Sequence, residues 1–172
     1  CSSDLDTVAR ITAEAKFIRA LSHYHVVRIW ALPYGYTSDN SHLGIPLKVS
    51  ADQTPQMRAT VGDVYAQIEQ DLLDAEADLP ASNGIFANQM AAKALLAKVY
   101  LEMGDFANAK TKAAEVINSG TYSLDPLLTN RFADHANANL PAEFIFTLVS
   151  TNESSATDTI VDERGMGFTW NY

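Results

Sequence analysis

Apolar residues recur every three or four positions in the first part of the chain, which is the spacing of a helix with one buried face. Residues 5–32 contain no Pro or Gly, so we expect one long helix there. Its apolar face is predicted to consist of Ile11, Ala15, Ile18 and Leu21, with Phe17, Tyr24 and Val27 beside them. Pro33 and Gly35 should end this helix, because both residues interrupt helical backbone.

A second helix is indicated over residues 61–79 by a capping motif followed by an apolar stripe. In Thr60-Val61-Gly62-Asp63 the Thr and the acid have the spacing at which both satisfy backbone donors at a helix start. The stripe consists of Val61, Val64, Ile68, Leu72, Ala75 and Leu79. The acids between these positions are expected to form a solvated face: Glu69, Asp71, Asp74, Glu76 and Asp78. Pro80 should end the helix.

The stretch YLEMGDFANAKTKAAEVINSG, residues 100–120, predicts the turn and second helix of a hairpin. The helix over residues 89–103 is rich in Ala and Leu, both strong helix formers. It should close at Gly104, because Gly readily takes the left-handed conformation that ends a helix. Asp105 should cap the next helix, which is expected to run to Ser119 and to stop at Gly120.

Two stretches fall outside this helical pattern. Residues 33–59 carry three Pro, two Gly and many small polar residues, so we predict a long inserted loop, a length that is uncommon unless it is functional. Residues 143–149, EFIFTLV, predict a strand, and the tail to residue 172 is predicted to be irregular. Because a lone strand needs a partner, we expect the chain to be part of a longer protein.

The hairpin has the residue pattern of a tetratricopeptide repeat, in which small residues let two antiparallel helices approach closely. The matching positions are Leu96, Ala97, Tyr100, Gly104, Phe106, Ala109, Ala113 and Val116, while Lys93 stands where the motif prefers Trp. We expect Tyr100 and Phe106 to fill the wider parts of the seam between the helices.

One repeat cannot bury its apolar face alone, and the two earlier helices supply a second pair. That pair is split by about 35 extra residues where a plain repeat has a tight turn. The chain is therefore predicted to be mainly α, with tetratricopeptide-like antiparallel helix hairpins in an α–α superhelix and a minor β element near the C-terminal end.

Length and composition agree with one globular domain. The 172 residues are 47% apolar and 19% charged, which suits a single core, and we predict one domain over residues 1–172. The 21 acids and 12 bases leave a formal charge of −9, which disfavours nucleic acid as a partner. No apolar run approaches the roughly 20 residues of a membrane-spanning helix, and no signal peptide opens the chain.

Cys1, the sole cysteine, excludes internal disulfides and Cys-rich metal sites. Cys1-Ser2-Ser3-Asp4 could be the acylated start of a lipoprotein or an arbitrary start of the chain, and the residues leave both readings open.

Several motifs together resemble the SusD/RagB family of surface glycan-binding lipoproteins. They are AEAKFIRA at 13–20, GIPL at 44–47, TVGDVYAQIEQDL at 60–72, AAKALLAKVYL at 91–101, MGD at 103–105, AEVINSG at 114–120, and Glu143 with Ile145 and Phe146. The likeness covers nearly all of this chain but only part of the family's usual length. In that family the lipidated Cys lies well upstream of the AEAKF-like helix, so the resemblance implies a lipid anchor outside this segment and not at Cys1.

The resemblance implies non-catalytic capture of oligosaccharides, or of peptides in some members, at the outer-membrane surface of the bacterium. The captured ligand would pass to a SusC-like TonB-dependent transporter, and neither cofactors nor catalytic residues are implied. The alternative reading is a tetratricopeptide-like scaffold for protein interactions that binds no small ligand.

Sugar binding without catalysis needs flat aromatic faces together with planar amides and carboxylates. Within or just before the inserted loop, the chain offers Trp30, Tyr34, Tyr36, Asp39, Asn40 and His42, which we take as the candidate ligand-binding residues. The alternative for Trp30 and Tyr34 is simple packing where the helix meets the loop.

Other chemistries find little support in the residues. His23 and His25 lie two apart on a helix and point in different directions, so we predict no shared metal. Asp71 and Asp74 line one predicted helix face and do not oppose each other across a cleft, as glycosidase acids do. No phosphate loop, nucleophile elbow or zinc motif appears.

Overall fold

The computed structural model describes residues 2–51, 54–127 and 142–148 of the chain, and these residues are mainly helical. The elements in chain order are α1 (Ser2–Trp30), β1 (Leu43–Pro46), β2 (Arg58–Thr60), α2 (Val61–Asp78), α3 (Gln89–Met103) and α4 (Phe106–Asn118). The predicted helices are therefore all found, with bounds within three residues of those expected. The irregular tail predicted beyond residue 149 lies outside the described residues.

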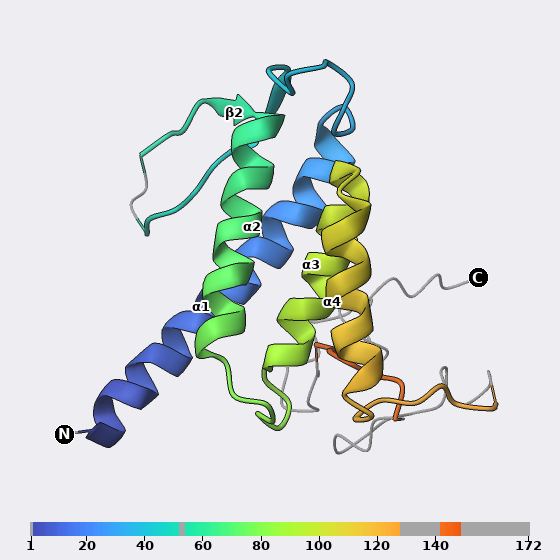
Figure 1. The fold of residues 1–172 in the computed structure, drawn as a ribbon. Coiled ribbons are helices and arrows are strands. Elements are labelled where there is room, and N and C mark those ends of the chain that lie inside the picture. The colour runs from blue at the N-terminus through green and yellow to red at the C-terminus, as the bar shows by residue number, and fades with distance from the viewer. Residues whose placement is uncertain (1, 52–53, 128–141, 149–172) are drawn as a thin grey trace, which may run out of the picture.

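The four helices of the described residues form two antiparallel hairpins that pack side by side (Figure 1). Lys16 and Arg19 of α1 pair with Asp74 and Asp71 of α2, so the two helices run in opposite directions. Helix α2 also packs on α3, and α3 packs on α4, so each helix is followed by its antiparallel neighbour. The tetratricopeptide-like arrangement is confirmed, including the first pair split by an insertion.

The core lies where α2 meets its neighbours, and its predicted stripe is confirmed. Val61, Val64, Ile68, Leu72, Ala75 and Leu79 are all buried. Six such side chains are enough to hold a helix in place, because full burial of one Val, Leu or Ile contributes about 1.5–3 kcal/mol.

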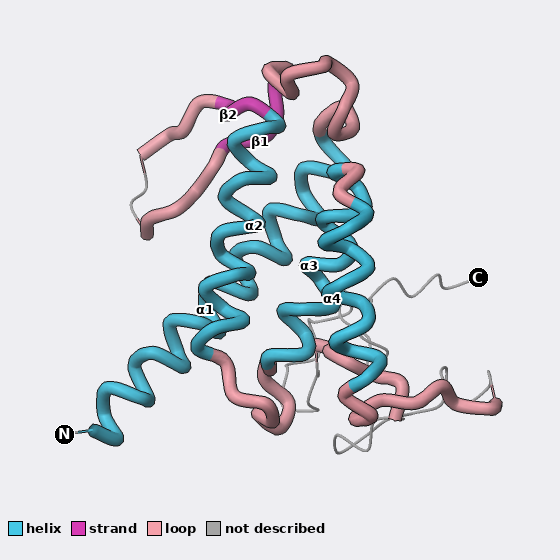
Figure 2. The backbone as a smooth tube through the Cα atoms, in the orientation of Figure 1, coloured by secondary structure: helices cyan, strands magenta, loops and turns pink. Residues whose placement is uncertain are grey.

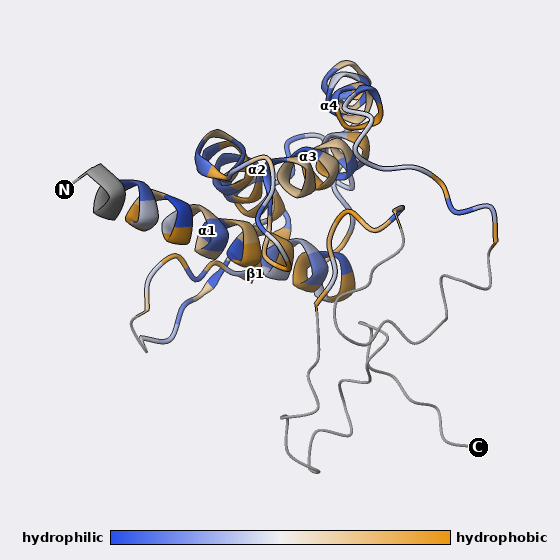
Figure 3. Cartoon of the chain, turned by 90° about the horizontal axis from the view of Figure 1, so that it is seen from below, coloured by the Kyte–Doolittle hydropathy of each residue, from blue (hydrophilic) through white to orange (hydrophobic). Residues whose placement is uncertain are grey.

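The predicted apolar face of α1 is confirmed for Phe17, Tyr24 and Val27 and wrong for Ile11 and Ile18. Ile11 and Ile18 are 52% and 42% exposed, whereas the buried side chains lie beside them: Ala13, Phe17, Ala20, Tyr24 and Val27. Two apolar stripes with helical spacing run along α1, and packing on α2 selects the one that carries the larger aromatic rings. Figure 3 shows hydrophobic residues along α1, including its N-terminal part, which extends beyond the other helices.

The predicted helix ends are confirmed in their chemistry. The Asp63 backbone N–H donates to Thr60 Oγ1 at 3.0 Å, and the Thr60 hydroxyl donates to the Asp63 carboxylate at 2.7 Å. Gly104 has a φ of 78°, the left-handed conformation, and its N–H donates to Leu101 O. The carboxylate of Asp105 then accepts from the Asn108 backbone N–H at 3.1 Å.

The seam between α3 and α4 is filled differently from the prediction. Tyr100 is 5% exposed and Ala109 is 7% exposed, as the repeat pattern requires. Phe106, however, is the first residue of α4 and is 69% exposed. The expectation that Phe106 fills the seam is therefore wrong.

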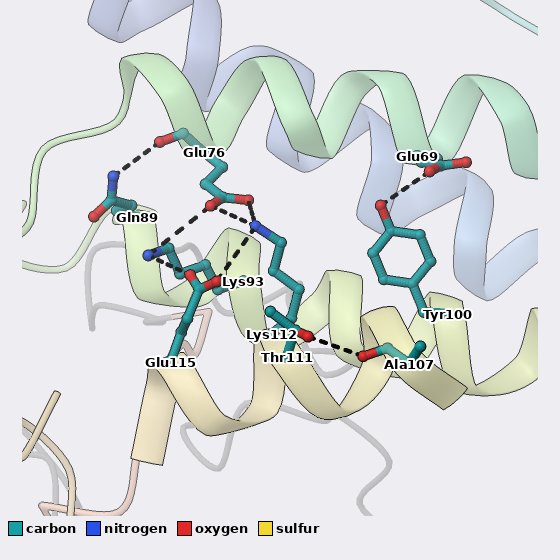
Figure 4. Close-up of polar contacts among 9 residues, drawn as sticks. All are labelled: Glu69, Glu76, Gln89, Lys93, Tyr100, Ala107, Thr111, Lys112 and Glu115. Carbon is teal, nitrogen blue, oxygen red and sulfur yellow. Dashed lines mark hydrogen bonds and ion pairs between the residues drawn. The ribbon is translucent and has the colours of Figure 1, made fainter. Parts of the chain in front are cut away.

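A set of polar contacts joins α2, α3 and α4 (Figure 4). Lys112 Nζ donates to both oxygens of Glu76 at 2.7 Å, and Lys93 pairs with Glu115 at 2.7 Å. Lys93, which stands where the repeat motif prefers Trp, thus lies within an ion-pair cluster between the helices. The Tyr100 hydroxyl donates to Glu69 at 2.9 Å.

The acids of α2 are accordingly not a purely solvated face. Asp71 is the clearest exception, since its side chain is 1% exposed. Arg19 donates to its two oxygens at 2.8 and 2.6 Å, and Gln67 Nε2 donates at 2.9 Å. A carboxylate that is buried this completely needs several donors, which the bidentate guanidinium supplies.

The β structure of the described residues lies in the inserted loop and not near the C-terminal end. Strands β1 and β2 pair antiparallel beside the start of α2, as Figure 2 shows. The strand predicted at 143–149 is wrong, because the described residues 142–148 form turns and irregular backbone. Its apolar pattern has another cause: Phe146 packs edge-on against Phe17 of α1, with ring centroids 4.9 Å apart.

Strands β1 and β2 approach each other very closely at Gly44. A Cβ atom added there would lie 3.1 Å from the carbonyl oxygens of both Ala59 and Thr60. Arg58 adds to the closure, since its Nε donates to Gly44 O at 2.6 Å. The base of the loop is therefore held by main-chain and side-chain contacts together.

The buried ion pair of Arg19 and Asp71 should contribute to the stability of the fold. Arg19→Met should lower the free energy of unfolding by about 3 kcal/mol, because it leaves the Asp71 carboxylate buried without its cation. Lys16→Met is a matched control on the same helix: its partner Asp74 is 34% exposed, so the loss should be about 0–1 kcal/mol. Urea denaturation of both variants measures the difference, and equal losses would contradict it.

The buried His23 should make the stability of the fold depend on pH. Its side chain is 8% exposed, and its Nδ1 has no hydrogen-bond partner among the described residues. Burial lowers the pKa of His23 below its ordinary 6.5, while Asp71 of α2 raises it and Arg19 lowers it. Because the unfolded chain binds this proton at a higher pH than the folded chain, stability should fall as pH drops below about 6.5.

His23→Leu should remove that part of the pH dependence without creating a new buried polar atom. The measurement is the urea midpoint of the parent and the variant at about pH 7.5 and about pH 5. We expect the parent to lose more stability than the variant over this interval. An identical loss in both would show that His23 does not contribute.

Candidate functional site

The first part of the inserted loop, residues 31–42, is shaped by hydrogen bonds within itself. The Tyr36 N–H donates to Pro33 O at 3.1 Å, and the Asn40 N–H donates to Thr37 O at 3.2 Å. Gly35 and Asn40 both have positive φ, 82° and 55°, and the Gly35 N–H donates to Asn40 Oδ1 at 2.6 Å. Asn tolerates this conformation better than most residues, which explains its place here.

Three of the six candidate residues support this loop. The Asn40 side chain closes the turn, and His42 Nδ1 lies 2.9 Å from Thr37 Oγ1 while its Nε2 lies 3.3 Å from Leu32 O. Asp39 accepts from the Ser41 backbone N–H at 3.2 Å. Hydrogen bonds from Ser41, then one from Thr37, lower the pKa of the exposed Asp39 carboxyl.

The three aromatic candidates divide into exposed and packed rings. Trp30 is 73% exposed at the end of α1, and Tyr36 is 63% exposed with its ring edge against His42, at 5.6 Å between centroids. Tyr34 is half-buried, and its ring packs edge-on against Tyr65 of α2 at 4.9 Å. The rings of Trp30 and Tyr36 are therefore accessible to solvent, while Tyr34 joins the loop to the helices.

A pocket of about 240 Å³ lies at the base of this loop. It is lined by Val27, Arg28, Ala31, Leu32, Pro33, Tyr34, Tyr65 and Glu102. These residues come from the end of α1, the start of the loop, α2 and the end of α3. Hydrogen bonds from Tyr24 of α1 and Tyr65 of α2 to Glu102 at the end of α3 join the three helices here. The helices themselves can be followed in Figure 1.

Glu102 is the centre of the polar contacts around this pocket. The Tyr24 hydroxyl donates to its Oε1 at 2.8 Å, and the Tyr65 hydroxyl donates to its Oε2 at 2.9 Å. Arg28 Nε lies 2.8 Å from Oε1. Burial, followed by the hydrogen bond to Glu102, raises the pKa of both tyrosines, so both remain donors at neutral pH.

Arg28 is held over the ring of Tyr24, with its Cζ 5.0 Å from the ring centroid. Its side chain is 48% exposed, whereas that of Glu102 is 29% exposed. The carboxylate and the aromatic face thus fix the guanidinium on two sides.

Sequence analysis missed Arg28, Tyr65 and Glu102 as components of a site. Tyr24 and Arg28 are one helical turn apart, which is a local signal for a shared face. No local signal connects them to Glu102, because 78 positions separate Glu102 from Tyr24. Only the stacking of the helices brings these residues together.

The chemistry available at the loop and pocket is that of binding. The described residues contain no group of three or more His, Cys, Asp and Glu that could hold a metal ion. None of the helices in the described ranges combines the length and the apolar content needed to cross a bilayer. What the site offers is exposed aromatic faces, fixed hydrogen-bond donors and an apolar-walled pocket.

A family model and two related proteins are similar to this chain in sequence. The family model SusD-like_3, described as starch-binding associating with outer membrane, matches residues 2–101. The SusD-like protein P2 of Formosa agariphila is 32% identical over 155 residues, which is 86% of this chain and 28% of that protein. The SusD-like protein P25 of the same organism is 28% identical over 75% of this chain and 23% of its own length.

Solved structures agree with the sequence relatives. A SusD superfamily protein from Bacteroides thetaiotaomicron aligns over 87% of this chain and 33% of its own, with a TM-score of 0.72 and 33% identity. A laminarin-binding SusD-like protein aligns over 94% of this chain and 34% of its own, with a TM-score of 0.70 and 27% identity. The chain thus spans about a third or less of the length of these relatives.

The resemblance found in the motifs is confirmed by the family model, the sequence relatives and the solved structures together. Since the model matches more than half of its residues, this chain belongs to the SusD-like family.

Proposed function

We propose that the protein containing this chain captures oligosaccharides without chemical change and delivers them to a TonB-dependent outer-membrane transporter. The observation that carries the proposal is the exposure of two rings, Trp30 and Tyr36, which flank in sequence the residues 31–34 that line a pocket. Aromatic faces stack on the C–H faces of sugars, and the hydrogen-bonded loop presents them without reordering. The family description and the laminarin-binding relative support a carbohydrate ligand.

Capture without catalysis is supported by how the acids of α2 are used. Asp71 is neutralised by Arg19, and Asp74 pairs with Lys16 at 2.7 Å. Hydrolysis of a glycosidic bond requires two carboxyl groups that face each other across the substrate, one of them free to donate a proton. These two acids are instead ion-paired on one helix.

The location that follows from this role is the outer surface of the outer membrane. The family description associates its members with that membrane. We infer that the described helices form one domain of a longer protein, anchored by a lipid outside this segment. Its partner would be a SusC-like transporter, and a peptide is the second class of ligand.

A scaffold for protein interactions is the second candidate function, because α1 exposes a row of apolar side chains. Val8, Ile11 and Ile18 are 61%, 52% and 42% exposed, at spacings of three and seven along one helix face. Apolar residues in such a row are typical of a helix that packs on another protein segment.

The glycan-binding proposal predicts the effect of removing the exposed rings. Trp30→Ala and Tyr36→Ala in the intact protein should each weaken binding of a recognised oligosaccharide about tenfold, because each removes one stacking face. Affinity electrophoresis in starch and laminarin gels identifies the glycan, and calorimetry measures the affinity.

Phe86→Ala is the matched control for these variants. Phe86 is also an exposed aromatic, 56% accessible, but it lies between α2 and α3 at the other end of the helices. It should leave the affinity unchanged. Full binding by both loop variants would remove this loop from the site, and a protein that binds no glycan but does bind a partner protein would favour the scaffold.

A further inference from the structure

The pocket at the base of the loop contains a guanidinium whose outer edge is unused. Arg28 Nε lies 2.8 Å from Glu102 Oε1, and the guanidinium donates no hydrogen bond to the described residues. The N–H groups of its two terminal nitrogens are thus left for a ligand, in the planar fork that donates to two neighbouring oxygens at once. The half-exposed side chain lies in the pocket lining, where a ligand can reach it.

Three contacts fix the direction of that fork. Glu102 holds Nε from α3, the ring of Tyr24 supports the plane of the guanidinium, and the Tyr24 and Tyr65 hydroxyls hold the carboxylate in turn. Arginine side chains are long, and much of the cost of binding is the loss of their freedom. In this pocket that freedom is already lost before a ligand arrives, so Arg28 is preorganised.

Charge determines which kind of ligand oxygen the Arg28 guanidinium can bind. Arg28 and Glu102 form a neutral pair, and the carboxylate also accepts from two tyrosine hydroxyls. The whole chain carries a formal charge of −9. A ligand carboxylate or sulfate would therefore enter a pocket with no net positive charge in a negatively charged molecule, whereas neutral hydroxyls avoid this repulsion.

The size and walls of the pocket decide how much of a glycan enters. A volume of about 240 Å³ is below the roughly 300–1,000 Å³ of pockets that enclose drug-sized ligands, so it suits one sugar ring and not several. Ala31, Leu32, Pro33 and Tyr34 add apolar surface to the pocket lining, and such surface packs on the C–H face of a pyranose.

We propose that this pocket is a binding site for a single pyranose ring of a neutral glycan. Arg28 donates to two adjacent hydroxyls of that ring, and the wall formed by Pro33 and Tyr34 packs on its C–H face. The proposal rests on the glycan-binding function proposed above and specifies it. Arg28 is the residue that selects for neighbouring hydroxyls, and Glu102 positions it.

The test uses the intact protein and measures its affinity by calorimetry for neutral laminari-oligosaccharides and malto-oligosaccharides, with oligogalacturonides as the acidic counterpart. Arg28→Gln should weaken binding of the recognised neutral oligosaccharide about tenfold or more, because it removes the fork. Arg28→Lys keeps the positive charge beside Glu102 but replaces the fork with one ammonium group, so it should lose affinity too. Circular dichroism and thermal unfolding confirm that each variant is folded.

Lys110→Gln is the matched control, since it removes one positive charge from an exposed position on α4 and should leave the affinity unchanged. Three outcomes would overturn the pocket proposal: full affinity of both folded Arg28 variants, full affinity of Arg28→Lys alone, or Arg28-dependent binding of oligogalacturonides in place of neutral glycans. If Trp30→Ala weakens binding while both Arg28 variants do not, the pocket proposal fails and glycan capture stands. If the parent protein binds no glycan, glycan capture itself fails.

Discussion

Burial of α2 on two sides is the constraint on which the rest of this structure depends. Ile68 and Leu72 have no exposed surface, because α1 covers one side of the helix and α3 covers the other. Since this contact is made by side chains and not by the connection between the helices, α1 and α2 can be far apart in sequence. Doubling the length of a flexible connection costs only about 0.6 kcal/mol, which is small beside the burial of one large apolar side chain. A long loop can therefore interrupt the first hairpin without loss of the pair.

Local signals allowed much of the fold to be predicted from sequence. The α2 stripe and the ends at Thr60, Gly104 and Asp105 depend on residues a few positions apart, and all were predicted correctly. The failures depend on neighbours distant in the chain. Two apolar stripes on α1 are equivalent until α2 selects one, Asp71 appears solvated until Arg19 reaches it, and the EFIFTLV pattern indicates a strand although Phe146 packs on Phe17.

The candidate site shows the same difference between local signals and contacts that are distant in the chain. Trp30 and Tyr36 were chosen because aromatic residues within or just before a polar loop are conspicuous in a sequence, and both are exposed in the structure. Asn40 and His42 were identified by type, yet the contacts that the structure gives them shape the loop. The Arg28 pocket was missed since its members come from three helices and the loop. The same carboxylate, Glu102, joins the helices and pairs with the guanidinium, so in the proposed site the contacts that stabilise the helices also position Arg28.

The closed base of the β1–β2 ribbon has a consequence for how the protein can be altered. Gly44 and Arg58 hold the two strands together where they leave the helices. Leu47 packs on the core and Arg19 of α1 donates to Val49 O at 2.9 Å, so changes at these positions would reach the helices, whereas changes between Val49 and Arg58 need not. An epitope tag or a fluorescent label inserted between Val49 and Arg58 would lengthen the hairpin and leave the contacts at its base in place. The ribbon is therefore a suitable insertion site, both for protein engineering and for natural sequence variation.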